Sequence, residues 1–114
     1  MTWLRPAGSL RDGGADVHVT PEVAGWTYSG MEVWTLAPGR PVDLVMDGIE
    51  GVLVPLSARD VDVDIDGEVT RLRGRAGVFD AVTDWMYVPL GSRLRISGAS
   101  GDIALCTARA TRVF

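Results

Sequence analysis

The sequence has no lysine, one histidine and one cysteine in 114 residues, so arginine carries all of its side-chain positive charge. With a net charge of −4 and no basic stripe, the chain lacks the electrostatic footprint of a nucleic-acid-binding protein. The single cysteine, Cys106, rules out a disulfide framework within the chain. It lies in the apolar run 103–106, and this position predicts a buried structural thiol rather than a nucleophile.

The single histidine, His18, restricts the chemistry that the chain offers. A catalytic zinc or iron site usually takes two or three histidines, or histidine with carboxylates, from rigid strands. His18 lies in a glycine-rich N-terminal segment, so we expect it to be solvated or locally hydrogen-bonded. No serine stands in a Gly-x-Ser-x-Gly elbow, and no glycine-rich phosphate loop opens a helix. The sequence therefore assigns no catalytic residue and no metal ligand to this chain.

Long apolar runs are also missing. Residues 1–14 contain no run suited to a signal peptide, and no stretch approaches the roughly 20 apolar residues of a membrane span. We therefore expect a cytoplasmic protein without a membrane partner. The composition, 46% hydrophobic and 23% charged, is that of a globular chain, and the length fits one domain, residues 1–114, with an irregular N-terminal segment at 1–24.

Short strands and turns are what the sequence does contain. Helical periodicity never persists for ten residues, whereas alternating segments follow one another at regular spacing from residue 30 onward. Asp47-Gly48 and Asp66-Gly67 predict hairpin turns. The predicted strands are 31–36, 42–46, 50–56, 60–66, 68–73, 85–89, 93–97 and 102–108, with a possible short strand at 17–19. Eight or nine such strands predict an all-β sandwich or small barrel of the jelly-roll type, in a single domain.

The acidic run at residues 60–66 invites a calcium hypothesis, because Asp62, Asp64 and Asp66 open like an EF-hand loop. That loop needs a bidentate glutamate at its twelfth position, which Arg73 holds here. A strand with one solvated acidic face explains the run without a metal. Because the like charges repel one another, we expect this strand at a sheet edge, where charge also discourages aggregation.

Two aromatic residues, Trp26 and Tyr28, stand out just before the first firmly predicted strand. Aromatic residues of β-sandwiches usually belong to the core. These two are spaced so that an extended segment presents both on one side, and each ring combines apolar area with a polar group. We therefore hypothesise that Trp26 and Tyr28 line a sugar pocket or a subunit interface.

A series of short motifs gives the chain a resemblance to a known family. The motifs are Gly-Trp-Thr-Tyr-Ser-Gly at 25–30, Leu-Ala-Pro-Gly at 36–39, Leu-Val-Pro-Leu-Ser at 53–57, Asp-Gly at 66–67, Gly-Arg-Ala-Gly-Val-Phe at 74–79 and Tyr-Val-Pro-Leu-Gly at 87–91. In this order and spacing they resemble the N-terminal half of the bicupin sugar isomerases, the family of 5-deoxy-glucuronate isomerase of myo-inositol catabolism. The resemblance covers residues 25–108.

The resemblance implies a cupin-like barrel, an aldose–ketose isomerisation of 5-deoxy-glucuronate to a 2-deoxy-5-keto-gluconate, a sugar-acid substrate and a homo-oligomer. It also implies a second barrel with a divalent metal beyond this chain. A metal-binding cupin carries His-x-His with a downstream Glu, and a further His soon after its Pro-x-Gly turn. Here Pro89-Leu90-Gly91 is followed by Leu94 at that histidine position, and there is no His-x-His.

Two functional interpretations follow from this departure. The first is a metal-free N-terminal cupin half of the isomerase, inactive without a C-terminal metal-binding barrel. The alternative is a free-standing, metal-free cupin that acts as a binding or scaffold module and dimerises. A gene that continues in frame beyond Phe114 into a barrel with a histidine cluster would favour the first.

Overall fold

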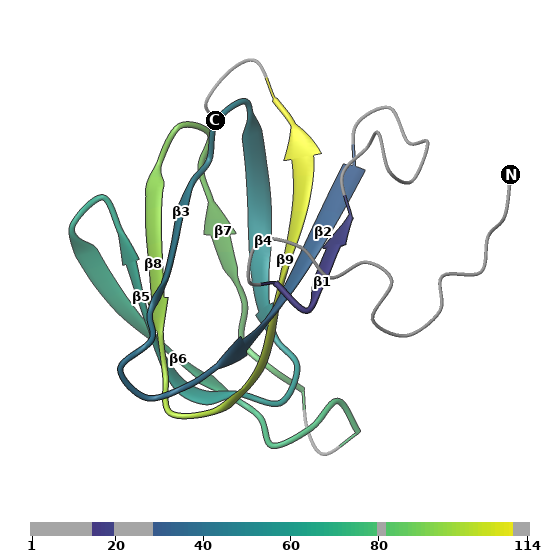
Figure 1. The fold of residues 1–114 in the computed structure, drawn as a ribbon, viewed down its shortest axis with the longest axis vertical. Coiled ribbons are helices and arrows are strands. Elements are labelled where there is room, and N and C mark those ends of the chain that lie inside the picture. Colours follow the sequence, from purple (N-terminus) through teal and green to yellow (C-terminus); the bar gives the residue numbers. More distant parts are fainter. Residues whose placement is uncertain (1–14, 20–28, 80–81, 111–114) are drawn as a thin grey trace, which may run out of the picture.

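The chain folds into two β-sheets that face each other across one apolar core (Figure 1). The computed structural model describes residues 15–19, 29–79 and 82–110. All nine elements in these ranges are strands, which confirms the all-β prediction. They are β1 (Val17–Val19), β2 (Ser29–Leu36), β3 (Val42–Val45), β4 (Ile49–Pro55), β5 (Arg59–Ile65), β6 (Glu68–Gly74), β7 (Met86–Val88), β8 (Arg93–Ser97) and β9 (Gly101–Arg109). The described residues include no helix long and apolar enough to cross a membrane.

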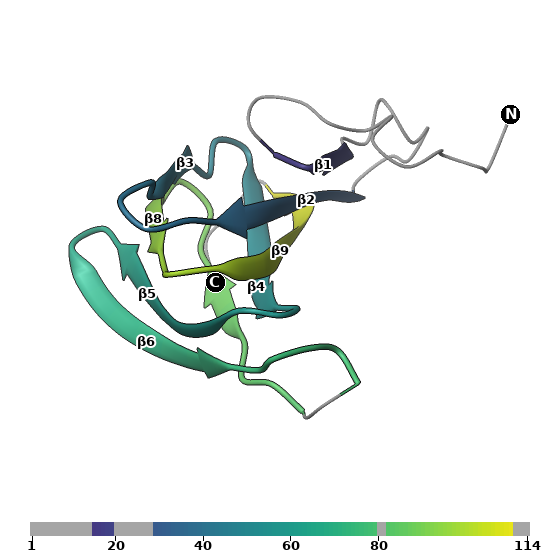
Figure 2. The same ribbon diagram turned by 60° about the horizontal axis from the view of Figure 1, so that its bottom comes forward.

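The larger sheet has the strand order β1-β2-β9-β4-β7, and the smaller has the order β3-β8-β5-β6. Every pairing in both sheets is antiparallel. Consecutive strands often change sheet, so the chain winds around the core instead of completing one sheet before the next (Figure 2). Residues 17–19, inside the segment expected to be mostly irregular, form the short edge strand β1 against β2.

The core lies between the sheets because each strand points alternate side chains inward. On β5, Val61 and Val63 are fully buried, while Asp62 and Asp64 between and after them point outward. The largest fully buried side chains come from both sheets and from the loops that join them: Met46, Leu53, Pro55, Val61, Val63, Val88, Leu94, Ile96, Ile103 and Leu105. The interior is therefore filled by aliphatic side chains and methionine.

The β5–β6 hairpin turns at Asp66 and Gly67, as the Asp-Gly pair predicts. Both residues have positive φ, 51° and 92°, which is the conformation of a type I′ turn and matches the twist of the flanking strands. The carboxylate of Asp64 accepts a hydrogen bond of 2.7 Å from the Gly67 backbone N–H and so fixes the turn. This turn sets the register in which β5 and β6 pair.

The acidic strand does not lie at a sheet edge, so that prediction is wrong. β5 pairs with β8 on one side and β6 on the other. Both neighbours place arginines beside the acidic side chains, and cross-strand pairing of opposite charges removes the repulsion on which the prediction rested. The edges of the smaller sheet are β3 and β6.

Cys106 is exposed, so the prediction of a buried thiol is also wrong. On β9, Ile103 and Leu105 point into the core, and strand alternation therefore turns Cys106 outward. The apolar run 103–106 concealed this, because a run without polar residues gives no indication of which face is buried.

Candidate functional site

Trp26 and Tyr28, the two aromatic residues proposed for a pocket or interface, lie outside the described residues. In sequence they directly precede β2, which starts at Ser29. Their role therefore stays a prediction.

The barrel interior around Leu94 is the place where the family resemblance predicted missing metal ligands. Leu94 lies on β8, is 2% exposed and pairs across the sheet with Leu44 of β3 and Ile65 of β5. Aliphatic side chains offer no lone pair to a cation, so this interior does not fit a divalent metal. Within the three described ranges, no group of three or more His, Cys, Asp or Glu side chains could hold a metal ion.

His18 and Glu32 form a partly buried pair on the core-facing side of the larger sheet. They are directly opposite each other in the β1–β2 pairing, and His18 Nδ1 lies 3.5 Å from Glu32 Oε1. The side chains are 27% and 16% exposed, so His18 is locally partnered rather than fully solvated. Imidazole and carboxylate are the groups that enzymes use most for general acid–base catalysis. Among the residues that the structure describes, we therefore regard this pair as the candidate for acid–base catalysis.

Trp34 lies two residues beyond Glu32 on the same face of β2 and packs against the core. Its indole Nε1 is buried and has no hydrogen-bond acceptor, the one such side-chain atom in the described part of the chain. A buried N–H without an acceptor destabilises the fold by about 1–3 kcal/mol. The core-facing side of β2 therefore has one hydrogen-bond donor without an acceptor, close in sequence to Glu32.

Glu32 was not identified from the sequence, although a signal for it was present. Trp34 and Leu36 are the inward positions of β2, and Glu32 shares their parity. A charged residue at a core-facing position is unusual and points to a partner. The partner, His18, is fourteen residues away in a segment without clear periodicity, so the pair emerges only from the β1–β2 register.

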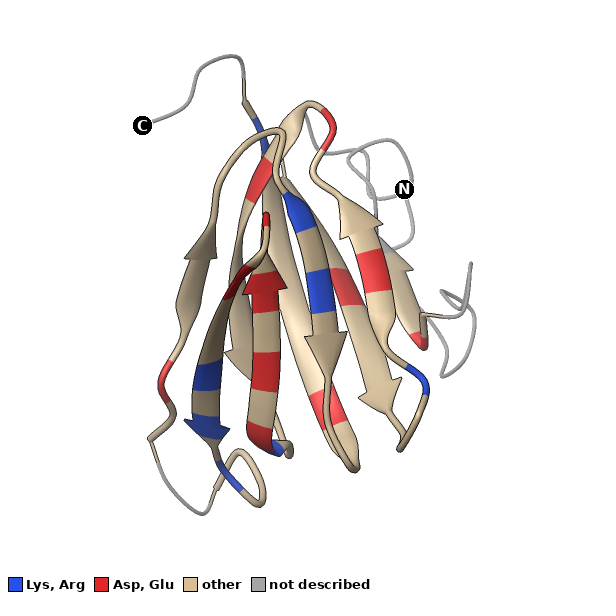
Figure 3. Ribbon diagram, turned by 90° about the vertical axis from the view of Figure 1, so that its left-hand side faces the viewer, with Lys and Arg blue, Asp and Glu red and all other residues tan. Residues whose placement is uncertain are grey.

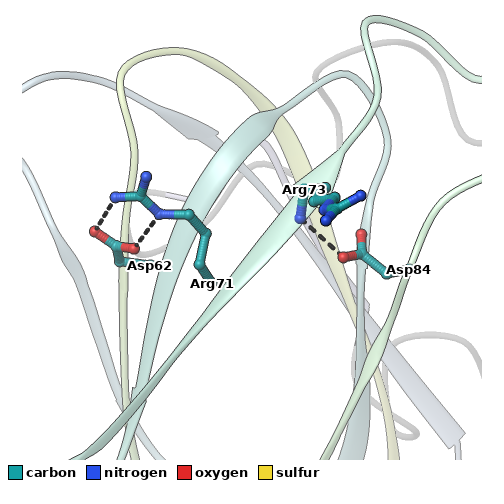
Figure 4. Close-up of polar contacts among 4 residues, drawn as sticks. All are labelled: Asp62, Arg71, Arg73 and Asp84. Carbon is teal, nitrogen blue, oxygen red and sulfur yellow. Dashed lines mark hydrogen bonds and ion pairs between the residues drawn. The ribbon is translucent and has the colours of Figure 1, made fainter.

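The outer face of the smaller sheet carries the acidic residues among arginines (Figure 3). Asp62 of β5 accepts two hydrogen bonds from Arg71 of β6, at 2.9 Å and 3.3 Å, as Figure 4 shows. Asp43 of β3 accepts two from Arg95 of β8, at 2.7 Å and 3.2 Å. The hydrogen bond from Arg71 lowers the pKa of Asp62, and the bond to Asp43 raises the pKa of Arg95. The charges on this face are therefore largely engaged with one another.

A hollow of about 580 Å³ opens on this face. Its charged lining consists of Asp43, Asp64, Asp66, Arg93 and Arg95. Three carboxylates outnumber two guanidinium groups, and Arg95 is already held by Asp43. The hollow is large enough for a small molecule, but its net charge repels an anionic one. It does not fit a sugar acid.

On the outward face of the larger sheet, the Tyr87 hydroxyl of β7 donates a hydrogen bond of 2.5 Å to Glu50 of β4. This bond, together with burial and the nearby carboxylate charge, raises the pKa of Tyr87. A tyrosine held in its neutral form is a hydrogen-bond donor rather than a base. The contact joins the edge strand β7 to its neighbour β4.

Comparison with known proteins gives the same fold and a specific family. A sequence profile of the KduI/IolB family matches residues 3–114. The chain is 31% identical over 108 residues to a 5-deoxy-glucuronate isomerase of Geobacillus kaustophilus (strain HTA426). That match covers 90% of this chain but 38% of the relative, so the chain spans about two-fifths of the relative's length.

Two solved structures resemble the fold. An IolB-like protein from Salmonella typhimurium LT2 matches with a TM-score of 0.78 and 27% identity, over 90% of this chain and 40% of that chain. A cupin protein from Bacteroides fragilis matches with a TM-score of 0.63 and 16% identity, over 97% of this chain and 91% of that chain. The second likeness shows that the fold is cupin-like.

Proposed function

The chain belongs to the KduI/IolB family, and from this we propose that it is the N-terminal, metal-free barrel of an aldose–ketose isomerase. The proposed substrate is a sugar acid, 5-deoxy-glucuronate, which is converted to a 2-deoxy-5-keto-gluconate in cytoplasmic myo-inositol catabolism. Support for the substrate comes from the name of the Geobacillus relative, 5-deoxy-glucuronate isomerase. Further support is the IolB-like structure from Salmonella, which matches at 27% identity.

The observation that carries the proposal is the aliphatic interior at Leu94. Isomerisation of an aldose moves a proton between neighbouring carbons and requires an acid–base group or a metal to stabilise the enediolate. Leu94, Leu44 and Ile65 offer neither. We therefore assign the divalent metal and the enediolate chemistry to a second barrel in the rest of the isomerase, with this barrel as its structural partner.

An isomerase assay tests the proposal directly. The chain is incubated with 5-deoxy-glucuronate and either Zn²⁺ or Mn²⁺, and the ketose product is measured. We expect no turnover, because the catalytic cluster is proposed to lie elsewhere. Turnover that is lost in His18→Ala and Glu32→Gln variants would overturn the proposal and assign the reaction to the pair in this barrel.

A chimera tests whether this barrel can replace its counterpart in an isomerase of the family. The matched segment of the Geobacillus isomerase is replaced by this chain, and the product is assayed. We expect activity, because this barrel is proposed to replace its counterpart. A second chimera with Leu53→Ala, which weakens the core, is the matched control and should be less heat-stable. A folded but inactive first chimera would contradict the proposal.

The second candidate function is a free-standing, metal-free binding or scaffold module that dimerises. The Bacteroides cupin favours it, because a barrel of this kind makes up 91% of that whole chain. Titration with 5-deoxy-glucuronate in a calorimeter separates the two functions when it is combined with the chimera. Sugar-acid binding by the isolated chain, with an inactive chimera, supports the module; an active chimera supports the isomerase half.

A further inference from the structure

The outward side of the larger sheet is apolar across its width. Leu53, Ile103 and Leu105 point into the core, so strand alternation turns their neighbours outward. In the observed register these outward residues form two rows that cross the sheet. One row is Met31, Cys106, Val52 and Tyr87, and the other is Val17, Val33, Ala104 and Val54. We call these residues the outer apolar face.

The centre of the outer apolar face is open to solvent. Cys106 of β9 lies between Met31 of β2 and Val52 of β4 and is exposed. Tyr87 is 37% exposed, Met31 and the valines are half-buried, and Ala104 is buried. The solvent side of an antiparallel sheet is normally polar, as the charged outer face of the smaller sheet is (Figure 3). An apolar one marks a contact surface.

The charged residues around this face are all acidic. Glu50 of β4 and Asp102 of β9 hold outward positions at opposite ends of the face. Asp16 lies close to Asp102, because the Thr35 hydroxyl is within hydrogen-bonding distance of both carboxylates. As far as the structure describes the five strands of this sheet, no arginine holds an outward position on them.

This charge pattern opposes a second copy of the chain as the occupant. A two-fold axis places the same patch of one copy against that of the other, so carboxylates of one copy would face carboxylates of the other. Such like-charge contacts act against pairing. The outer apolar face therefore fits a different surface, one with an apolar centre and basic residues at its rim.

The rest of the isomerase is the partner at hand. This chain covers 38% of the Geobacillus isomerase and 40% of the IolB-like chain, so both relatives have further chain to place. In the proposed enzyme a second barrel follows this one. The chain leaves this barrel from β9, the middle strand of the larger sheet, and Ala110 is tied there by its N–H to the Gly48 carbonyl at 3.0 Å. A second barrel thus begins beside the outer apolar face.

The size of the face suits contact between two domains. Five strands about 4.8 Å apart, crossed by two rows about 7 Å apart, cover on the order of 400 Å². Counted on both partners, this is about 800 Å², within the roughly 600–1,500 Å² of interfaces between domains of one chain.

We propose that the second barrel of the isomerase docks on the outer apolar face, with Cys106 at the centre of the contact and basic residues of that barrel opposite Glu50 and Asp102. The inference rests on the proposed function, which supplies the second barrel. It adds the side on which the two barrels meet. The charged outer face of the smaller sheet then stays in solvent.

The reactivity of the Cys106 thiol tests the contact. The labelling rate with a maleimide, followed by peptide mass spectrometry, is compared between the isolated chain and the chimera with the Geobacillus isomerase. We expect rapid labelling of the isolated chain at every protein concentration. In the chimera we expect labelling to be roughly tenfold slower or more, because the thiol reacts only when the barrels separate. The control is Val45→Cys in a Cys106→Ser background, because Val45 is exposed on β3 of the other sheet and should label equally in both proteins.

Three labelling results would overturn the proposal. Equal Cys106 rates in chain and chimera would mean that the second barrel docks elsewhere. Protection that grows with the concentration of the isolated chain would assign the face to a second copy. Slow labelling of the isolated chain at all concentrations would mean that the chain covers its own face. An active chimera with unprotected Cys106 refutes the contact and leaves the proposed function standing, whereas an inactive chimera with protected Cys106 does the reverse.

A charge placed in the contact gives a second measurement. Cys106→Asp should change the thermal unfolding midpoint of the isolated chain little, because the site is exposed there. In the chimera the same carboxylate would be buried between the barrels, and we expect the midpoint to fall by about 5 °C or more. Val45→Asp is the matched control and should change neither protein. A chimera that tolerates Cys106→Asp as well as the isolated chain does would contradict docking on this face.

Discussion

Two sets of apolar side chains in this chain stand in opposite surroundings. One set lies between the sheets, and the other lies in the connecting loop between β6 and β7, where Val78, Phe79, Val82 and Trp85 are exposed. Leu53, at the centre of β4, is completely buried, whereas Phe79 is completely exposed. The first set fills the space between the two sheets with aliphatic side chains. The second set is held outward by hydrogen bonds at the base of its loop. The comparison separates two uses of hydrophobicity, one that maintains the fold and one that is available for contact.

The sharpest test of this difference is the substitution Leu53→Ala. Removing a fully buried leucine side chain leaves a cavity, and we expect the free energy of unfolding to fall by about 2–5 kcal/mol. Urea denaturation followed by tryptophan fluorescence measures the change. Val45→Ala, at an exposed site, serves as the control and should change stability little. A loss below that of the control would contradict a tightly packed interior.

The second test is Gly74→Ala, at the base of the loop. Gly74 has a φ of +69°, and a Cβ atom there would stand 1.9 Å from the Ala58 carbonyl oxygen. Because both the backbone conformation and the contact oppose a side chain, we expect a loss of about 2–3 kcal/mol in the free energy of unfolding. Gly67→Ala, where φ is also positive but no atom lies within 4 Å, is the matched control and should lose less. Equal losses would show that the close approach is unimportant.

The third test concerns Asp84 and pH. Burial raises the pKa of Asp84, but the backbone N–H groups of Gly74 and Arg73 outweigh this effect and lower the pKa below its ordinary value of 3.8. The ionised carboxylate is therefore favoured in the folded state, and its stabilisation is fully present above the unfolded-state pKa. It is lost as the pH falls through the lower folded-state pKa.

We expect Asp84→Asn to lower the free energy of unfolding by about 1 kcal/mol at pH 7, at the low end for two hydrogen bonds because the site is largely exposed. The difference from wild type should vanish below the folded-state pKa of the carboxyl group. Denaturation curves over a series of pH values measure it. A difference that grows on acidification would have the wrong sign for this account.

The smallest effect is expected for the double variant Phe79→Ser/Val82→Ser. Both side chains are almost completely exposed, so their replacement should change the free energy of unfolding by no more than about 0.5 kcal/mol. Urea denaturation followed by tryptophan fluorescence measures the change. A loss as large as that of Leu53→Ala would mean that the loop packs against its own barrel, and the comparison would fail.

The sequence predicted the strands well, because alternation and turn residues agree along most of the chain. The Asp66-Gly67 hairpin is the clearest case, since its two residues suit positive φ and both flanking strands alternate. The sequence could not predict which strands become neighbours in a sheet. β5 is an inner strand, and arginines of β6 and β8 lie opposite its carboxylates, so the like charges do not force it to the sheet edge.

The candidate site was less predictable than the fold. Leu94 was identified from the sequence as the residue at the position of a cupin histidine, and the structure places it in the core on β8. The pairing of His18 with Glu32 depends on the β1–β2 register and could not be read from either residue alone. The exposure of Phe79 was equally hidden, because a phenylalanine beside a valine in a sequence does not reveal whether the pair lies inside or outside.

The indole N–H of Trp34, buried without an acceptor, gives the molecule a built-in spectroscopic reporter. A hydrogen bond moves an indole proton downfield, so the Trp34 proton should resonate upfield of tryptophan N–H groups that donate to an oxygen, and its burial should slow exchange with D₂O. Because Trp34 packs against the core, this NMR signal reports whether the barrel is folded. Because Trp34 lies on the same face of β2 as Glu32, the signal also reports the binding of any molecule that places an oxygen atom beside the indole N–H.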